Sequence, residues 1–573
     1  MKRWLALGST ALIMNPLFAA EPAPLVLNLL GRYSTGVFEK SAAEIPAFDP
    51  ASKRAFVVNA QKGVVDVLDL RDPNQPVALG ELSATAVLPQ AVVNSVAVKN
   101  GIVAIAIEAP VKTNPGKVAF YRAADLSLIS HVGVGAQPDM LTFSPDGKSV
   151  VVANEGEPSV DYQIDPEGSV SIINIQNLKK PAVRTADFRA FNGREKQLRD
   201  AGVRIYGPYA SAAQDLEPEY ITISADSKTA WVTLQENNAL AKVDLKQAKV
   251  SDVLPLGFKD HGVEGNGLDV SDKDKKINIR SWAGVKGMYQ PDSIASYSVA
   301  GNTYLVLANE GDARAWGEDD KAYWAGDAAK GFVEEIRVKH LLHKDGFAGQ
   351  KELPPQLAKL AKGAVLNPAV FAYCGASVQS AGDCIDDEQL GRLTVSWTQG
   401  YQVGDDGLPK LNAEGKLVYD QLFAQGGRSF SIRDANGKLV WDSGDQFEQQ
   451  LAKIEPKFFN TNHGKTAFDD RSDNKGPEPE GLAVGQIGER TYAFIGLERI
   501  SGVMMYDISN PAAPTFAGYT STRNFEAKEL AAAGDLGPEG LAFVAEKDSP
   551  TGEPLLIVGN EVSGTTAIFS IIQ

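Results

Sequence analysis

The chain is poor in the residues from which many catalytic and metal sites are built. Its 573 residues include two cysteines, five scattered histidines and six methionines. No G-x-S-x-G sequence occurs, so an α/β-hydrolase is not indicated. The run "NHGKT" at 462–466 is similar to the end of a phosphate-binding loop but has Phe459 in place of the first glycine. These absences argue against an α/β-hydrolase, a zinc enzyme and a P-loop NTPase.

Long apolar runs are also scarce, and the one at the N-terminus has the form of a secretory signal. Lys2 and Arg3 precede an apolar stretch that ends in small residues at Ala19 and Ala20. We therefore expect a signal peptide over 1–20, a single domain over 21–573 and a periplasmic or secreted protein. No other segment approaches membrane-spanning length, so we expect no membrane span.

Positive charge is in deficit. There are 56 Lys and Arg against 72 Asp and Glu, and the formal charge of −16 becomes −18 once Lys2 and Arg3 are removed. Such a balance repels phosphate backbones and anionic lipid surfaces. Nucleic acid is therefore not an expected partner, and the sequence identifies no protein partner.

The two cysteines, Cys374 and Cys384, lie ten residues apart in "YCGASVQSAGDC". In an exported protein this spacing predicts a disulfide that staples one loop. The alternative, a redox or metal-binding thiol pair, would be expected to show C-x-x-C spacing.

What the chain does have is a repeat. Seven segments start with one five-residue pattern: an acid, any residue, an apolar residue, a small residue and an apolar residue. Each segment then runs through a turn into a second apolar strand, and several continue into a third strand. The seven are "EIPAF" (44), "NSVAV" (94), "DMLTF" (139), "EYITI" (219), "DSIAS" (292), "EGLAV" (480) and "EGLAF" (539). Repeated strand, turn and strand units predict an all-β protein, a seven-bladed β-propeller.

The repeat starts are 45 to 188 residues apart, so the excess is expected to form insertions between blades. The largest, about 316–389, contains two stretches that read as short helices, "FVEEIRVKHLLHKDGF" and "PPQLAKLAKGAVL". "GRLTVSW" and "GGRSFSIRDANGKLVWDSGD" are interpreted as outer strands of the fifth blade, with a turn at Asn436 and Gly437. Residues 25–36 are expected to form a closing strand beside the last blade.

Acids recur at two points of each repeat. Because antiparallel strands return to the same edge, the start of the first strand and the end of the second are expected to meet at one rim. The first ring comprises Glu44, Asp139, Glu219, Asp292, Glu480 and Glu539, with Asn94 as its neutral member. The second comprises Glu108, Glu155, Glu236, Glu310, Glu498 and Glu561, with Ala60 as the exception.

So many neighbouring carboxylates require protons or cations, because each close pair repels strongly in a partly desolvated site. Calcium suits such a site, since it takes 6–8 oxygen ligands in loose geometry. Asn and Glu side by side at 154–155, 309–310 and 560–561 are predicted to supply amide and carboxylate ligands together. We therefore predict several bound calcium ions. In the alternative interpretation the acids accept backbone hydrogen bonds and fasten adjacent blades.

A further calcium candidate is the loop "NGLDVSDKDKKIN" at 266–278, where Asp269, Asp272 and Asp274 crowd together without forming an EF-hand. Its alternative is solvated loop charge. Four arginines lie beside acidic signatures and are candidate ligands for a phosphate group, or else neutralise the rim through salt bridges: Arg314, Arg428, Arg471 and Arg499.

Several long runs resemble the choice-of-anchor I family across essentially the whole mature chain: "DDRSDNKGPEPEGL", "YAFIGLERISGVMMYDISNP", "GGRSFSIRD" with "DSGDQFE", "GDLGPEGL" and "NEVSGTT". Bacterial members of that family are often labelled alkaline phosphatase-like, and others resemble cell-surface glycoproteins of biomineralising animals. The fold also resembles calcium-dependent propeller phosphatases. These resemblances imply a calcium-dependent phosphoesterase acting on a small phosphorylated substrate. The alternatives are a non-catalytic calcium-binding envelope or matrix protein and a protein-interaction propeller; no catalytic nucleophile is identifiable.

Overall fold

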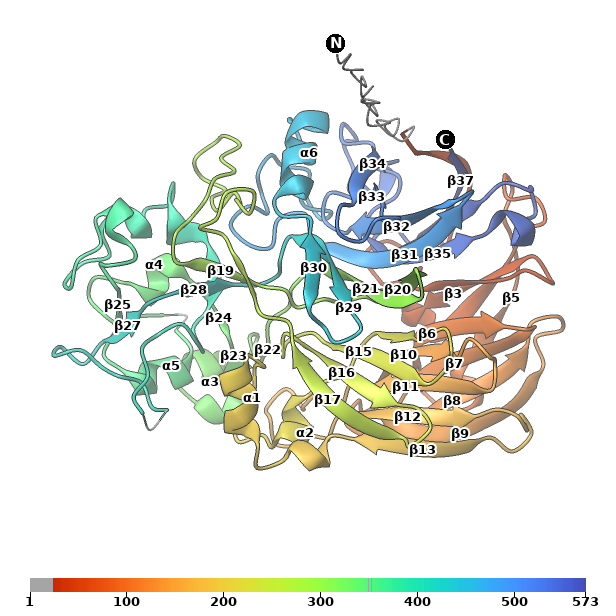
Figure 1. The fold of residues 1–573 in the computed structure, drawn as a ribbon, viewed down its shortest axis with the longest axis horizontal. Coiled ribbons are helices and arrows are strands. Elements are labelled where there is room, and N and C mark those ends of the chain that lie inside the picture. The colour runs from red at the N-terminus through yellow and green to blue at the C-terminus, as the bar shows by residue number, and fades with distance from the viewer. Residues whose placement is uncertain (1–23, 349, 352, 406) are drawn as a thin grey trace, which may run out of the picture.

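The computed structural model describes residues 24–348, 350–351, 353–405 and 407–573, so the predicted signal peptide lies outside the described residues. That part of the chain is mainly antiparallel β-sheet, with short helices (Figure 1). None of its helices has the length and apolar character needed to cross a membrane.

Seven of the sheets have four strands, and each predicted repeat provides the first strand of one of them. The first strands are β2 (Pro46–Asp49), β6 (Val92–Lys99), β10 (Pro138–Phe143), β14 (Ile221–Ile223), β20 (Ile294–Val299), β31 (Pro479–Ile487) and β35 (Pro538–Val544). The second strands are β3 (Arg54–Asn59), β7 (Ile102–Glu108), β11 (Ser149–Asn154), β15 (Thr229–Leu234), β21 (Asn302–Asn309), β32 (Arg490–Leu497) and β36 (Leu555–Asn560). The third are β4 (Val64–Asp69), β8 (Pro115–Arg122), β12 (Ser169–Asn174), β16 (Ala239–Asp244), β29 (Ser429–Asp434), β33 (Gly502–Asp507) and β37 (Thr565–Ile572). The fourth are β5 (Val77–Ser83), β9 (Leu128–Ala136), β13 (Ala182–Asp187), β17 (Lys249–Pro255), β30 (Leu439–Asp442), β34 (Thr515–Thr520) and β1 (Val26–Ser34).

The first strands lie next to one another in sequence order. They contact in the order β2, β6, β10, β14, β20, β31 and β35, and β35 contacts β2 again. The hydrophobic core lies between neighbouring sheets: Phe56 and Val65 of one sheet, for example, share a cluster with Val96 and Ile105 of the next. Sheets that bury their faces against their neighbours around a common centre form a β-propeller, as the repeats predict.

The closing strand is confirmed. β1 pairs antiparallel with β37, so the first described strand completes the sheet formed by the last three. Leu25 and Leu27 are buried in one cluster with Phe569 of β37. Pairing with β1 covers the edge of β37, and the packing of Leu25 and Leu27 joins the first described strand to the last sheet.

A large segment, 310–428, is inserted between β21 and β29 and packs beside the propeller (Figure 1). The predicted insertion, about 316–389, lies inside it. Its helices are α3 (Lys321–Trp324), α4 (Val338–Leu341) and α5 (Pro355–Leu360), and its strand pairs are β22 (Ala315–Trp316) with β23 (Phe332–Val333) and β25 (Ala364–Leu366) with β27 (Leu417–Tyr419). α4 and α5 lie within the two stretches expected to be helical, but the first half of "FVEEIRVKHLLHKDGF" forms strands β23 and β24 instead.

A five-stranded sheet joins this insertion to the segment before β20. Its strands are β18 (Phe258–Asp260), β19 (Val285–Met288), β28 (Leu422–Ala424), β26 (Thr394–Ser396) and β24 (Glu335–Arg337). The assignment of "GRLTVSW" to the fifth blade was therefore wrong, because its strand β26 pairs with β24 and β28. The hairpin around Asn436 and Gly437 was right: β29 and β30 pair with each other, and β29 pairs with β21. Outside the insertion, the described residues form the α-helices α1 (Glu195–Ala201), α2 (Ala212–Asp215) and α6 (Gln446–Ile454).

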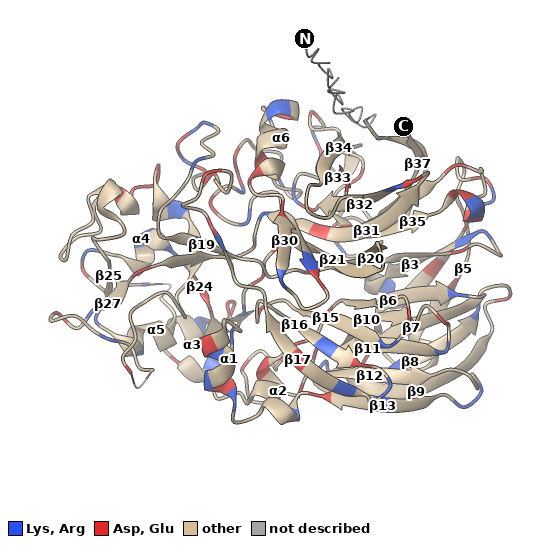
Figure 2. Ribbon diagram, viewed as in Figure 1, with Lys and Arg blue, Asp and Glu red and all other residues tan. Residues whose placement is uncertain are grey.

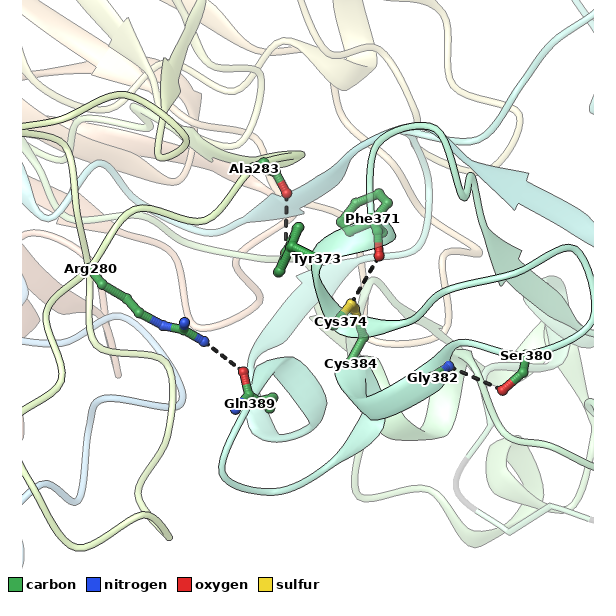
Figure 3. Close-up of a disulfide and its surroundings, with 9 residues drawn as sticks. All are labelled: Arg280, Ala283, Phe371, Tyr373, Cys374, Ser380, Gly382, Cys384 and Gln389. Atoms are coloured by element: carbon green, nitrogen blue, oxygen red, sulfur yellow. Dashed lines mark hydrogen bonds between the residues drawn. A yellow bond between two sulfur atoms is a disulfide. The ribbon is translucent and has the colours of Figure 1, made fainter.

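The predicted disulfide is present. Cys374 and Cys384 are bonded, with their Cα atoms 5.3 Å apart (Figure 3). The stapled loop is held against the segment before β19, because the Tyr373 hydroxyl donates to the carbonyl oxygen of Ala283 at 3.2 Å. A disulfide of this kind is typical of proteins folded outside the reducing cytosol.

Candidate metal centre

The two predicted rings of acids meet at one edge because of the strand register. In the sheet that starts at β35, Pro538 pairs with Asn560, and the residue that follows each of them is a ring acid, Glu539 or Glu561. The ladder is irregular between Pro538 and Leu541, so Glu539 lies in a bulge. The sheets starting at β10 and β31 have the same arrangement. Bulges of this kind turn a side chain away from the regular pleat.

The first ring surrounds a cavity of about 180 Å³. Close packing around it explains a glycine of the repeat: a Cβ on Gly481 would collide with the carbonyl oxygen of Glu539 on the next first strand. Five of the seven first-ring positions line the cavity: Glu44, Asn94, Asp139, Asp292 and Glu539.

Carboxylates from both rings gather into groups. In each group, one potential ligand atom per residue lies within 4.8 Å of the others, a separation that a single cation can span. The groups at the rim are Glu155 with Glu219 and Glu236; Asp292 with Glu310 and Glu480; Glu310 with Glu478 and Glu498; and His463 with Glu498 and Glu561. The structure therefore brings first-ring and second-ring acids close together.

Three of these acids each have a buried oxygen without a hydrogen-bond partner among the described residues. They are Oε2 of Glu219, of Glu236 and of Glu480. The first two belong to one group, and both residues are at most 8% exposed. A buried carboxylate oxygen without a partner is costly, so these atoms fit a cation better than they fit an arrangement completed by the protein alone.

The electrostatic environment of the rim disfavours ionised carboxylates. Burial, which disfavours the charged form, is the largest cause that raises the pKa of eleven ring acids, and neighbouring carboxylates raise it further. The pKa of Glu44 rises to about 8 and those of Asp139, Glu236 and Glu310 to about 7. The pKa is also raised at Glu108, Glu155, Glu219, Asp292, Glu480, Glu539 and Glu561. Without a cation, several of these acids would carry protons near neutral pH.

One acid outside the predicted rings behaves in the opposite way. Glu478 is fully buried, yet Lys475, Arg471 and Arg499 overcome the effect of burial and hold its pKa well below the usual range. Arg499 Nε lies 2.8 Å from Glu478, Lys475 Nζ lies 3.1 Å from it, and Arg471 also forms an ion pair with it. Lys475 Nζ additionally lies 2.6 Å from Glu310. Sequence reasoning missed Glu478 and Lys475.

A local signal for Glu478 existed in the doubled acid E-P-E, which occurs at 217–219 and 478–480. At both sites the first glutamate pairs with arginine: Glu217 Oε2 lies 2.8 Å from Arg314, and Glu478 pairs with Arg499. The second glutamate at each site, Glu219 or Glu480, has the unpartnered oxygen. The motif thus combines one neutralised carboxylate with one that lacks a protein partner.

All four candidate arginines form ion pairs with carboxylates, and charged residues of both signs are spread over the propeller and the insertion (Figure 2). Arg314 is buried against Asp215 and Glu217, and Arg428 Nη1 lies 2.8 Å from Glu448. The side chains of Arg471 and Arg499 are 17% and 22% exposed. Salt-bridge formation is therefore what the structure shows, and phosphate binding by these residues stays a prediction.

The amides of two of the Asn-Glu pairs form hydrogen bonds within the protein, and calcium ligation by these pairs stays a prediction. Asn154 Nδ2 donates to Ser171 Oγ at 2.9 Å, and its Oδ1 accepts from the amide of Gly135 at 3.1 Å. Asn309 Nδ2 likewise donates to Ser429 Oγ at 3.2 Å. These amides fasten the second strand to the third, while the glutamates that follow them turn to the rim.

The three aspartates of the acidic loop at 266–278 do not share one set of partners. Asp272 forms ion pairs with Arg392, at 2.7 Å, and with Lys273. Asp269 and Asp274 instead group with Asp469, which sequence reasoning did not single out. No local pattern relates these positions, because about 200 residues separate Asp469 from the loop.

Comparison with known proteins places this geometry in a family. The chain is 27% identical over 367 residues to the mesenchyme-specific cell surface glycoprotein of Strongylocentrotus purpuratus, a match covering 59% of this chain and 42% of that protein. It is 32% identical over 199 residues to gigasin-3a of Magallana gigas, covering 32% of this chain and 66% of that protein. The chain thus matches less than two thirds of the length of either relative.

Among solved structures, hydrazine synthase of Kuenenia stuttgartiensis aligns over 94% of this chain and 99% of that chain, with a TM-score of 0.43 and 12% identity. The choice-of-anchor I domain matches residues 44–511, a span that includes the rim acids up to Glu498. On this match over most of its length, the chain belongs to the choice-of-anchor I family.

Proposed function

We propose that the seven four-stranded sheets are the blades of one propeller domain over 21–573 and that its rim acids bind several calcium ions. The observation that carries the proposal is the set of buried, unpartnered oxygens on Glu219, Glu236 and Glu480, each within a group of three carboxylates. Purely structural acids would be expected to have backbone or side-chain partners.

Calcium is the favoured ion because the rim donors are overwhelmingly carboxylate oxygens. Hard oxygen ligands in irregular geometry suit calcium, whereas magnesium requires near-octahedral order and zinc prefers nitrogen and sulfur. Export supports the same choice, and it is itself supported by the disulfide and by the cell-surface name of one relative. We propose a periplasmic or secreted location on these grounds.

Calcium titration of metal-free protein by calorimetry tests this proposal. We expect the Glu219→Gln plus Glu236→Gln variant to lose at least one ion, or to bind it about tenfold more weakly or worse, because two ligand charges are removed. The matched control is Glu81→Gln plus Glu489→Gln, which neutralises two exposed acids. Absence of calcium binding by the wild-type protein would refute the proposal.

The phosphoesterase activity is a second, narrower proposal. It is favoured by Arg471 and Arg499, which are partly exposed and lie beside the carboxylates Glu310, Glu478 and Glu498. Bound calcium would supply Lewis-acid chemistry there. The two arginines would orient and neutralise the phosphate oxygens, and their ion pairs with Glu478 would fix their positions.

Turnover of phosphomonoesters, phosphodiesters and phytate, measured with calcium and with chelator, tests this activity. We expect Arg471→Lys to lower kcat/KM by about tenfold or more, because the planar guanidinium contact is lost while the charge remains. The exposed Arg194→Lys is the matched control. If folded, calcium-replete protein hydrolyses none of these at neutral or alkaline pH, the non-catalytic calcium-binding protein becomes the better account.

A further inference from the structure

A group of three carboxylates uses none of the ring positions and joins two segments that are remote in the sequence. Asp269 and Asp274 belong to the loop 266–278, and Asp469 lies between α6 and β31. One potential ligand atom from each lies within 4.8 Å of the other two. The fold therefore places three carboxylate groups close together between two loops.

Two members of this group are almost fully buried. Asp269 is 0% and Asp469 is 1% exposed. Asp269 accepts from the amides of Asn278, at 2.6 Å, and Ser271, at 3.3 Å. Asp469 Oδ1 accepts from Ser472, but its Oδ2 is buried and has no hydrogen-bond partner among the described residues. An unpartnered, buried carboxylate oxygen beside two further carboxylates points to a cation.

The buried arginine beside this group is engaged by other acceptors. Arg428 pairs with Glu448 at 2.8 Å and donates to the carbonyl oxygens of Asp269 and Ser472. Glu448 is a further carboxylate beside this group, since its Oε2 accepts a hydrogen bond from the amide of Asp269 at 3.3 Å. Arg428 therefore offsets Glu448, and the charge of the three aspartates remains.

We propose that Asp269, Asp274 and Asp469 hold one divalent cation of the calcium type, which clips the loop 266–278 to the segment that leads into β31. All three donors are carboxylate oxygens, and water completes the coordination of a hard cation. Asp274 is half-buried, so the site is open to solvent on its side. The inference does not depend on calcium at the rim.

The clip has a structural consequence for the rim. The segment anchored by Asp469 runs on to Arg471, Lys475, Glu478 and Glu480. Fixing its start restricts the conformations of the residues that neutralise and line the rim. Loss of the clip cation is therefore expected to increase amide hydrogen exchange in 266–278 and 469–478.

The test compares Asp469→Asn and Asp274→Asn with Asp470→Asn in metal-free protein titrated with CaCl2. Asp470 is adjacent to the group and pairs with Lys465 at 3.0 Å, so it gives the same chemical change outside the site. We expect Asp469→Asn and Asp274→Asn each to bind one calcium ion fewer, or to bind it about tenfold more weakly or worse, whereas Asp470→Asn matches the wild type. In the two site variants, calcium should no longer slow exchange in 266–278.

The Glu219→Gln plus Glu236→Gln variant separates this site from the rim. If that variant keeps one ion that Asp274→Asn removes, the clip is supported even if the rim binds no calcium. Wild-type stoichiometry, affinity and calcium-dependent exchange in Asp274→Asn would overturn the clip, whatever the rim does. Asp274→Asn alone decides the matter if Asp469→Asn fails to fold, because Asp274 is half-buried.

Discussion

In the presence of chelator, the protein is expected to lose stability as the pH rises from about 4.5 to about 8, and calcium is expected to abolish this loss. Glu44 shows the sign: burial raises its pKa from 4.5 to about 8. Between these values the folded state keeps a proton that the unfolded state releases. The stabilising contribution is therefore complete below 4.5 and is lost as the pH passes about 8.

The expected effect is large because the pKa values of many rim acids are raised in the folded state. Each unit of pKa difference corresponds to about 1.4 kcal/mol, so even one uncompensated acid changes the free energy of unfolding measurably. Bound calcium stabilises the ionised carboxylates and adds the free energy of ligand binding to the folded state.

Urea unfolding between pH 4.5 and 8.5, with calcium and with chelator, measures this prediction. In chelator, the free energy of unfolding of the Glu480→Gln plus Glu539→Gln variant should fall less with rising pH, since two of the titrating groups are gone. Glu81→Gln plus Glu489→Gln should follow the wild type. Identical pH profiles with calcium and with chelator would show that the rim acids are compensated without the ion.

Glu478→Gln is expected to destabilise the protein by about 3–5 kcal/mol at neutral pH, because it removes the buried carboxylate that three cations share. Glu478 is fully buried and forms ion pairs with Arg471, Lys475 and Arg499. Glutamine conserves the shape of the side chain but not its charge. The free energy of unfolding in urea provides the measurement.

The pH dependence of this variant has the opposite sign to that of the rim. The pKa of Glu478 is lowered in the folded state, so its contribution is present above the usual value of 4.5 and is lost as the pH falls through the folded value. The difference between wild type and Glu478→Gln should therefore shrink in acid. The exposed Glu489→Gln, with less than about 0.5 kcal/mol of change, is the control. An equally small effect at Glu478 would mean that the three cations find other partners.

Much of the propeller could be predicted from local sequence. The seven first strands begin at the seven repeats, and the hairpin β29–β30 turns at Asn436 and Gly437. The closing strand β1 follows from an apolar stretch that needs a sheet to join. Strand periodicity, turn chemistry and repetition act over a few residues, so they can be read without the fold.

The strand β26 shows where local reading fails. "GRLTVSW" has the composition of a strand, but composition does not specify a partner, and β26 pairs with β24 and β28 rather than with the fifth blade. Which sheet such a segment joins depends on side-chain packing with partners that are remote in the sequence.

By itself, therefore, the sequence determined that acids stand at the start of the first strand and after the second strand of nearly every repeat. Only the tertiary structure decided which of them are neutralised. Lys475 pairs with Glu310, which is 165 residues away in the sequence. Asp269 groups with the remote Asp469 and not with its near neighbour Asp272. The physical reason is that charge compensation and burial depend on long-range contacts. Strand formation depends mainly on neighbours along the chain, and a carboxylate acquires its pKa and its partners only once the sheets have assembled.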